Sequence, residues 1–381
     1  MNGLGIASPK NIQSDLEHIN QFNSTPGKGI TRVLFTEEEI NARLYIKRRM
    51  KDLGLEIRED AIGNIFGKLK GSEPQLPPIW TGSHIDTVLN AGQFDGMVGV
   101  VGALEAIRLI KETKLPRKRN IEVVVFTSEE PTRFGKGCLG SRALAGKLTL
   151  EDAQNMFDEE GNSLAEVLEN LNYNLNEFKN IKVAQGSVHA FIELHIEQGA
   201  VLESLGVPIG IVNTISAPTD IHVNVVGKQG HAGSTPMNMR QDALMAAAEI
   251  FLKLESLARV SRSSNTVGTI GKVKVFPNAS NVIPGEVFFT IDIRDSDFSS
   301  KETLVKKIKC FINSISFIRD VNISVNVINH DCPKNAAKHI VEAIKASCNE
   351  RHYAYHEMVS GAYHDAMFVA EFAPFGMIFV P

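Results

Sequence analysis

The chain has 381 residues, of which 43% are hydrophobic and 22% are charged. This length suggests about two domains, and so much apolar material excludes a mainly disordered protein. The net charge of −4 comes from 40 Lys and Arg against 44 Asp and Glu. A nearly balanced surface has no general attraction for nucleic acid or an anionic membrane, so we expect neither as a partner.

The apolar runs and the cysteines indicate where in the cell the protein is located. No stretch reaches the roughly 18 uninterrupted apolar residues that cross a bilayer, and residues 1–10 lack a secretory signal pattern. The four cysteines lie far apart and form no CxxC pair. Unpatterned thiols are typical of a reducing compartment, so we expect a cytoplasmic protein.

The first half of the chain alternates strand and helix patterns. Residues 79–83 and 121–126 are short apolar strands on either side of the helix-length apolar stretch 97–110. A further strand is predicted over 190–194, and the polar, Asn-rich residues 150–187 predict helices and loops. Strand, helix and strand joined by short links predict a parallel α/β unit with a right-handed crossover.

The pattern changes from about residue 221. Alternating strands and amphipathic helices follow in the order β-α-β-β-α-β, with two helices expected on one face of an antiparallel sheet, at 221–225, 240–258, 267–275, 287–293, 301–315 and 321–327. Helix and strand character then resumes from residue 339. We therefore predict an α/β fold: a mainly parallel-sheet domain (1–213 and 329–381) interrupted by a smaller, ferredoxin-like α+β domain (214–328).

Histidines and carboxylates recur where the predicted strands end: His84, Asp95, Glu129-Glu130 and His195. Ligands bind at this edge of α/β sheets, and mixed His and carboxylate ligation suits zinc or manganese. A single histidine beside a strand is more often packed than a ligand, but the recurrence favours a metal site. On an extended segment adjacent side chains point opposite ways, so one glutamate can bind metal while the other acts as general base. The alternative is a solvated acidic loop.

Residues 135–140 (GKGCLG) match GxGxxG, which is found in dinucleotide-binding turns. Such a turn directly joins a strand to a helix, and an acid ends the next strand. Here residues 127–134 intervene, and the region about 20 residues further on has no apolar strand. The spacing therefore argues against a nicotinamide-dependent oxidoreductase.

Together, eight ordered motifs resemble the ureido-cleaving amidohydrolases of the dinuclear-metal peptidase superfamily: TGSHIDTV, GQFDG, FTSEEPTRFG, CLGSRALAG, ELHIEQG, GHAGSTPM, NVIPGEV and AYHDAMF. That group includes allantoate and ureidoglycolate amidohydrolases and N-carbamoyl-L-amino-acid hydrolases. The resemblance runs from about residue 60 to the end, and EEPTRFG and AYHD are most similar to the ureidoglycolate branch.

The resemblance implies a role for each matching residue. It assigns the first metal to His84 and His195, a bridging position to Asp95, the second metal to Glu130, the general base to Glu129 and the orientation of His84 to Asp86. It assigns substrate contacts to Gln198, His231, Asn281, Arg294 and His364. Arg294 suits a bidentate carboxylate clamp, or else a salt bridge between strands. His231 suits oxyanion stabilisation, or else is a loop histidine, and His364-Asp365 also suits a helix start.

The activity implied by the resemblance is hydrolysis of the C–N bond of a small ureido acid in purine catabolism, releasing ammonia and carbon dioxide. Two divalent ions, zinc or manganese, would activate a water and polarise the ureido carbonyl. Glu129 would take the proton of that water and deliver it to the leaving nitrogen. The inserted domain of such enzymes is a lid that forms a homodimer, so His231, Asn281 or Arg294 would act across subunits.

The sequence departs from this family in two places. Relatives carry a further histidine for the second metal just after a strand like GMIFVP (376–381), where this sequence ends. We therefore expect a C-terminus truncated before that ligand, or a second metal site that is weak or empty. Asp220 stands where allantoate-cleaving relatives carry a basic residue, which counts against allantoate. Rival predictions are a peptidase or deacylase of the same superfamily and a metal-deficient binding protein.

Overall fold

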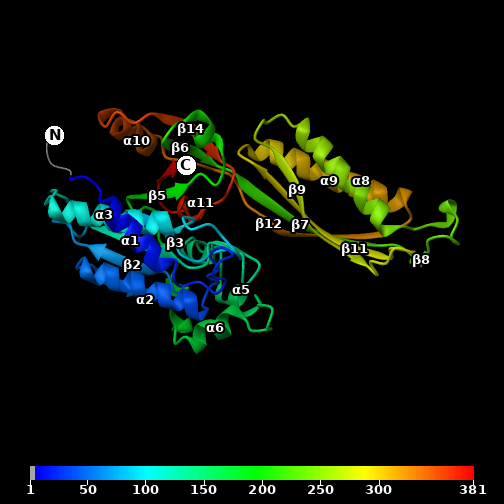
Figure 1. Cartoon of the computed structure of the whole chain (residues 1–381), viewed down its shortest axis with the longest axis horizontal. Coiled ribbons are helices and arrows are strands. Elements are labelled where there is room, and N and C mark those ends of the chain that lie inside the picture. Colours follow the sequence, from blue (N-terminus) through cyan, green and yellow to red (C-terminus); the bar gives the residue numbers. More distant parts are fainter. Residues whose placement is uncertain (1–4) are drawn as a thin grey trace. The chain divides into compact units, whose positions relative to one another are not determined.

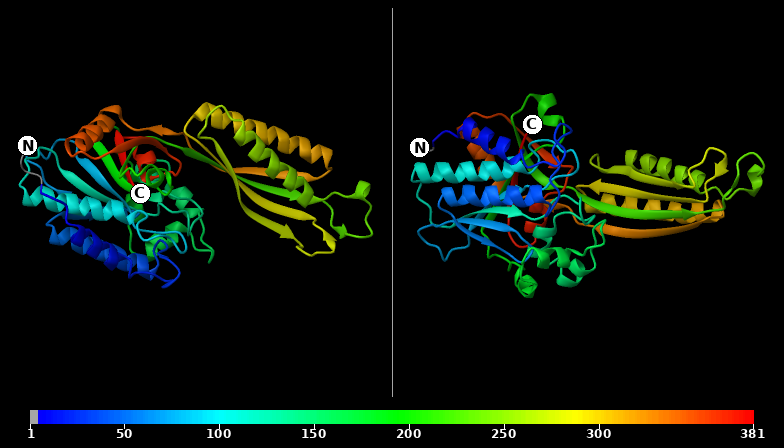
Figure 2. Two further views of the ribbon diagram at one scale, coloured as in Figure 1. Left: turned by 45° about the horizontal axis from the view of Figure 1, so that its top comes forward. Right: turned by 60° about the horizontal axis from the view of Figure 1, so that its bottom comes forward.

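A computed structural model describes residues 5–381, which form two compact units (Figures 1 and 2). Unit 1 contains the described residues up to Asn213, together with Ala336–Met358 and His364–Pro381. Unit 2 contains Thr214–Asn335 and Val359–Tyr363. Within the described residues, no helix is both long and apolar enough to cross a membrane.

Unit 1 contains most of a mixed sheet, whose order within residues 5–381 is β1-β2-β4-β3-β5-β15-β6-β13, with β14 paired to β6. Strand β13 and the last two residues of β6 and of β14 belong to unit 2. The central strands β4, β3, β5 and β15 run parallel, and the pairs toward both edges are antiparallel. The α/β fold predicted from the sequence is confirmed. The strands are β1 (Glu56–Glu59), β2 (Ile65–Leu69), β3 (Ile79–His84), β4 (Ile121–Phe126), β5 (Ala190–Ile196), β6 (Ile209–Ile215), β13 (Lys334–Asn335), β14 (Tyr355–Ser360) and β15 (Phe375–Val380).

Helices cover both faces of this sheet. They are α1 (Pro9–Ile19), α2 (Glu37–Asp52), α3 (Met97–Glu112), α4 (Leu139–Leu144), α5 (Leu150–Gln154), α6 (Leu164–Asn170), the 3-10 helix η1 (Leu175–Asn180), α7 (Val201–Leu205), α10 (Lys338–Glu350) and α11 (Asp365–Val369). The apolar helix α3 packs closely on β3 and β5 because Gly99 has no side chain: a Cβ there would lie 2.4 Å from the carbonyl oxygen of Leu194. This close packing places the start of α3 beside the ends of both strands.

Unit 2 is an antiparallel sheet of order β12-β7-β11-β9 with two helices packed on it (Figure 1). Its elements are β7 (Ala217–Val226), β8 (Gly230–His231), the 3-10 helix η2 (Met237–Met239), α8 (Ala243–Arg259), β9 (Val267–Phe276), β10 (Val282–Ile283), β11 (Glu286–Asp295), α9 (Phe298–Ile318) and β12 (Asn322–His330). Ile221, Val223 and Val225 alternate into the core beneath the helices. Helix α8 begins three residues later than expected, because the Asp242 side chain accepts the first free amides and caps it there.

Candidate active site

Three ligand groups converge at the carboxyl ends of β3 and β5. These two parallel strands are neighbours, so His84 at the end of β3 lies near His195 in β5. Asp95, in the loop before α3, completes the group: its Oδ1 lies 3.4 Å from His195 Nε2 and 3.7 Å from His84 Nε2. The loop passes this close because Gly96 adopts φ 69°, and a Cβ at that position would lie 2.5 Å from the His84 ring.

Backbone carbonyls fix the orientation of both histidine rings. His84 Nδ1 lies 3.0 Å from the carbonyl oxygen of Asp86, and His195 Nδ1 lies 3.0 Å from that of Ile196. Both Nε2 atoms are therefore directed at Asp95 Oδ1, and none of these three buried atoms has a hydrogen-bond partner among the described residues. Gln198 holds Asp95 from the other side, donating from Nε2 to Oδ2 at 2.6 Å. Two imidazole nitrogens and a carboxylate oxygen, each braced from behind, are a suitable donor set for a divalent metal ion.

Asp86 connects the histidine loop to the two glutamates. Its carboxylate accepts the backbone amides of Glu129 at 3.2 Å and Glu130 at 3.0 Å, besides lying 3.6 Å from His84 Nδ1. Ser128 adopts φ 53°, so the two glutamates follow a turn rather than a simple extension of β4. Glu129 is buried with Oε2 3.8 Å from His84 Nε2, whereas Glu130 is half-buried. The neighbouring glutamates therefore occupy different environments, although they follow a turn and not the extended segment that the sequence predicted.

Burial and close charges shift the pKa values of four groups in this region. Burial raises the pKa of Glu129 well above its usual value, and burial together with nearby carboxylates raises the pKa of Glu130 to about 7. Burial lowers the pKa of His84, but Glu129, Asp86 and Asp95 outweigh it and the pKa rises above its usual value. Burial and the neighbouring His84 lower the pKa of His195 to about 4. A bound cation would favour the ionised carboxylates and the neutral imidazoles.

A second group of possible ligands lies beside the first: Glu193, His195 and His364, all buried. The rings of His195 and His364 are 4.5 Å apart. Burial raises the pKa of Glu193 to about 8. Glu193 was not among the site residues predicted from the sequence, although its position two residues before His195 on one strand places both side chains on the same face. Glu130, predicted to hold the second metal, belongs to neither group.

Two predicted substrate residues of unit 2 lie together in the β8–β10 ribbon. His231 pairs with Val282, and the Ala232 amide donates to the carbonyl of Asn281 at 2.9 Å. The exposed His231 ring accepts the amides of Gly233 and Ser234 at Nδ1, at 3.1 and 3.2 Å. This fixes the ring and leaves Nε2 as the nitrogen for a ligand.

Arg294, the predicted carboxylate clamp, forms an ion pair with a carboxylate of its own strand. Its guanidinium binds Asp292 at 2.8 Å and lies over the Tyr363 ring. Asp220 stands opposite Asp292 in the β7–β11 pairing. Burial and Asp292 raise the pKa of Asp220 to about 6. Arg294 is thus partnered by a carboxylate two residues away, rather than across strands.

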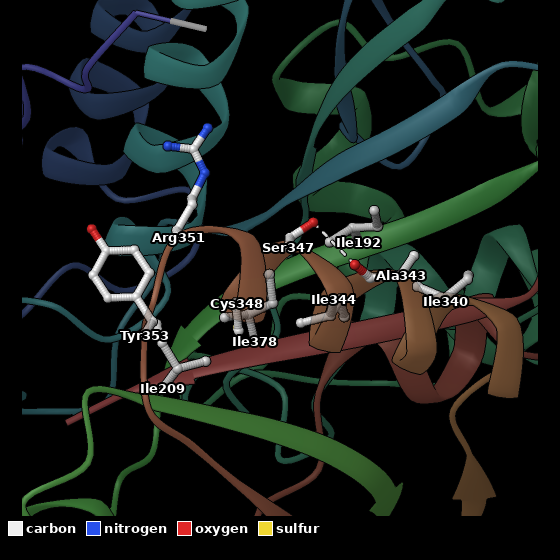
Figure 3. A pocket seen from close by; sticks show the side chains of 10 residues that line it. All are labelled: Ile192, Ile209, Ile340, Ala343, Ile344, Ser347, Cys348, Arg351, Tyr353 and Ile378. Carbon is white, nitrogen blue, oxygen red and sulfur yellow. Dashed lines mark hydrogen bonds between the residues drawn. The ribbon is translucent and has the colours of Figure 1, made fainter. Parts of the chain in front are cut away.

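A separate apolar cavity of about 290 Å³ lies between α10 and strands β5, β6 and β15 (Figure 3). Isoleucines dominate its lining, among them Ile192, Ile340 and Ile378, and Arg351 extends away from them at its rim. None of the predicted site residues lines it. This cavity is therefore separate from the converging histidines and carboxylates at the strand ends.

Comparison with known proteins agrees with the sequence motifs. The sequence pattern of Peptidase family M20/M25/M40 matches residues 80–381. The chain belongs to this family. It is 42% identical to a ureidoglycolate hydrolase of Arabidopsis thaliana (99% of this chain, 80% of the relative) and 36% to an N-carbamoyl-L-amino-acid amidohydrolase of a Pseudomonas species (98% and 90%). An allantoate amidohydrolase of Escherichia coli is 34% identical (97% and 89%).

The structural comparison agrees. The crystal structure of AtUAH in complex with glyoxylate matches with a TM-score of 0.90 and 40% identity, over 100% of this chain and 91% of that one. The resemblance to the ureido-cleaving amidohydrolases is confirmed, and so is the prediction of a hydrolase acting on C–N bonds.

Proposed function

We propose that this chain hydrolyses the C–N bond of a small ureido acid in a metal-dependent reaction, releasing ammonia and carbon dioxide. The observation that carries the proposal is the convergence of His84 Nε2, Asp95 Oδ1 and His195 Nε2, three buried atoms without a hydrogen-bond partner in the described part of the chain. The named substrates of the relatives supply the substrate class: ureidoglycolate, N-carbamoyl-L-amino acids and allantoate. Among these, we favour ureidoglycolate.

His84, Asp95 and His195 would hold one divalent ion, zinc or manganese. Glu130, together with Asp95, would contribute to a weaker second ion site, because Glu130 belongs to neither group of converging ligands. When bound, such ions lower the pKa of a water and polarise a carbonyl. Gln198 keeps the Asp95 carboxylate turned toward the two histidines through its hydrogen bond to Oδ2.

Glu129 is assigned as the general base. Burial gives its carboxylate a raised pKa, so it holds a proton more readily than an exposed glutamate does. Its carboxylate can therefore accept a proton from the attacking water at Oε2, the oxygen on the His84 side, and pass it to the departing nitrogen. His364, whose ring lies 4.5 Å from that of His195, is assigned to the substrate or to a metal ion.

Substrate recognition is assigned to three residues of unit 2. His231 presents Nε2, and Asn281 is its neighbour in the ribbon. Arg294 would exchange its bond to Asp292 for the carboxylate of the substrate, a bidentate interaction that a guanidinium makes well.

We also propose that the protein forms a homodimer through unit 2 and is located in the cytoplasm. Apolar side chains are exposed on α8 (Met245 and Leu252) and on the edge strand β9 (Val267, Val273 and Phe276), which supports pairing with a second copy. The molecular mass of the protein in solution tests the proposed homodimer. The four cysteines are unpaired, and two of them are buried, which suits a reducing compartment.

Ammonia release from ureidoglycolate, allantoate and N-carbamoyl amino acids, with added Mn²⁺ or Zn²⁺, tests the function. We expect Glu129→Gln to lower kcat by at least about 1000-fold while retaining the metal, because it removes the proton acceptor and conserves the shape. Glu122→Gln is the matched control, because Glu122 is a buried carboxylate on β4 that pairs with Arg58.

Full activity of Glu129→Gln would contradict the assignment of the base. If the wild-type protein releases no ammonia from any ureido acid, the activity itself is refuted. Dipeptides and N-acetyl amino acids are assayed in parallel, because their cleavage would identify a peptidase or deacylase. Binding of less than one metal ion per chain, without turnover, would favour a binding protein.

A further inference from the structure

Asn64, in the turn before β2, links three segments of unit 1 beside the glutamate loop. Its side chain is fully buried. Its Oδ1 accepts the backbone amide of Thr127 at 2.9 Å, and its Nδ2 donates to the carbonyl of Gly140 at 3.2 Å. One side chain thus connects the strand that precedes Glu129 with the first turn of α4.

Asp60 fixes which way the Asn64 amide faces. The Asp60 carboxylate accepts Asn64 Nδ2 at 2.7 Å and the Asn64 backbone amide at 2.8 Å. The Nδ2 group is therefore directed at Asp60 and Gly140, and Oδ1 at Thr127. The site is also closely packed: a Cβ on Gly140 would lie 2.0 Å from Asn64 Oδ1.

The glutamate loop is otherwise held by its backbone. The carbonyls of residues 127–129 accept the amides of Gly140, Leu139 and Cys138 at 2.8, 3.0 and 2.9 Å. Asp86 holds the amides of Glu129 and Glu130. Asn64 provides a side-chain contact at the start of this loop. It binds both the loop, at the Thr127 amide, and the first turn of α4, at the Gly140 carbonyl.

We propose that Asn64 is a positioning residue for Glu129, acting through the Thr127 amide and the Gly140 carbonyl. Its partners are backbone groups and Asp60, so it acts on the reaction only through the loop. Loss of its oxygen leaves a buried amide without an acceptor, which the loop relieves by moving. A displacement of about 1 Å at a reacting group can cost about 100-fold in rate. The effect on rate rests on the proposed function, but the effect on the loop does not.

The experiment compares Asn64→Ala with Asn120→Ala in the metal-loaded full chain. Asn120 is a matched control: it is a buried asparagine just before β4, and it accepts the Gly71 amide and donates to the Pro74 carbonyl. For Asn64→Ala we expect kcat to fall about 100-fold with KM within about threefold, because the base and not the substrate contacts is displaced. For Asn120→Ala we expect kcat within about threefold of the wild type.

Hydrogen exchange supplies a readout that needs no turnover. We expect the amides of residues 127–130 to exchange at least about tenfold faster in Asn64→Ala, with β5 unchanged as internal reference and no such change in Asn120→Ala. Unchanged exchange over 127–130, or the same change in both variants, would overturn the inference. If the wild type turns over no ureido acid, the function fails while the exchange result still decides the positioning role.

A second pair of variants covers the case in which Asn64→Ala does not fold. In Asn64→Asp, an oxygen replaces the Nδ2 donor. The new carboxylate then faces the Asp60 carboxylate and the Gly140 carbonyl oxygen, and it repels both. Adding Asp60→Asn returns an amide donor to that contact. We expect kcat of the double variant to be at least about tenfold higher than that of Asn64→Asp. We also expect the amides of residues 127–130 to exchange more slowly in the double variant than in Asn64→Asp. Equal kcat and equal exchange in these two variants would overturn the inference.

Discussion

Two charged clusters, one in each unit, differ in how their charges are balanced. At the strand ends of unit 1, imidazole and carboxylate atoms face one another without a donor between them. On the sheet of unit 2, Arg294 is bonded to Asp292, and Asp220 lies opposite. In the first cluster the buried ligand atoms have no hydrogen-bond partner among the described residues, whereas in the second the arginine is already paired with a carboxylate.

This difference separates two kinds of prediction that the sequence could not distinguish. Histidines and carboxylates at strand ends indicate a metal ion only if their ligand atoms remain free, and here they do. An arginine at the end of a strand indicates a carboxylate ligand only if it has no nearer partner, and Arg294 has one. Metal binding in unit 1 should therefore be intrinsic, whereas substrate binding by Arg294 should compete with Asp292.

The largest expected effect is the loss of metal from unit 1. His195→Ala removes one of the three converging ligands, so we expect metal affinity and kcat each to fall by more than about 1000-fold. Isothermal titration with Mn²⁺ or Zn²⁺ measures the affinity. His189→Ala, an exposed histidine just before the same strand, should bind metal as the wild type does. Equal affinity in both variants would show that the converging atoms hold no ion.

A smaller effect is expected at the balanced arginine. Arg294→Gln should raise KM for a ureido acid about 10- to 100-fold with little change in kcat, the range expected for a hydrogen bond to a charged group. Asp292→Asn should lower KM about threefold, because it frees the guanidinium. Arg259→Gln, which breaks an exposed pair in the same unit, is the control. An unchanged KM in Arg294→Gln would leave Arg294 with a structural role only.

The smallest effect concerns stability and pH in unit 2. The pKa of Asp220 in the folded chain is about 6, above its value of about 3.9 in an unfolded chain. Its ionisation is therefore less favourable in the folded chain than in the unfolded chain. The free energy of unfolding falls progressively as pH rises from about 4 to above 6. We expect Asp220→Asn to raise the free energy of unfolding by about 1 kcal/mol at pH 7.5, a value reduced for its partial exposure.

The measurement for Asp220 is a thermal melt between pH 4 and 8. Asp220→Asn should melt higher than the wild type at pH 7.5 and equally at pH 4. Asp320→Asn, at an exposed position in the same unit, should show no such pH-dependent difference from the wild type. A constant difference across this pH range would mean that Asp220 acts by packing rather than by charge.

Much of the fold was predictable because its periodicity is local. The apolar run 121–126 coincides with β4, and the stretch 97–110 lies inside α3. The N-terminal helices α1 and α2 were missed: α2 in particular carries charged residues along most of its length and buries Glu39 and Arg43 as a pair. Buried ion pairs resemble surface residues in a sequence, so pattern alone does not reveal such a helix.

The candidate site was partly predictable, since His84 and His195 lie toward strand ends that the parallel topology brings together, and Asp95 lies in the loop between β3 and α3. Glu193 and Asn64 were not identified. Both act through partners distant in the chain: Glu193 accepts Ser83 Oγ and the Ala366 amide, and Asn64 accepts the Thr127 amide. Such contacts follow from the folded arrangement, and no spacing rule within one segment predicts them.

Asp86 has a consequence for anyone redesigning this enzyme. Its carbonyl lies against His84, while its carboxylate grips the amides of Glu129 and Glu130. In the proposed mechanism, Asp86 therefore couples the metal ligand His84 to the base Glu129. A library that varies the ligand loop in order to change metal preference is expected, in this mechanism, to disturb proton transfer as well, unless Asp86 is kept constant.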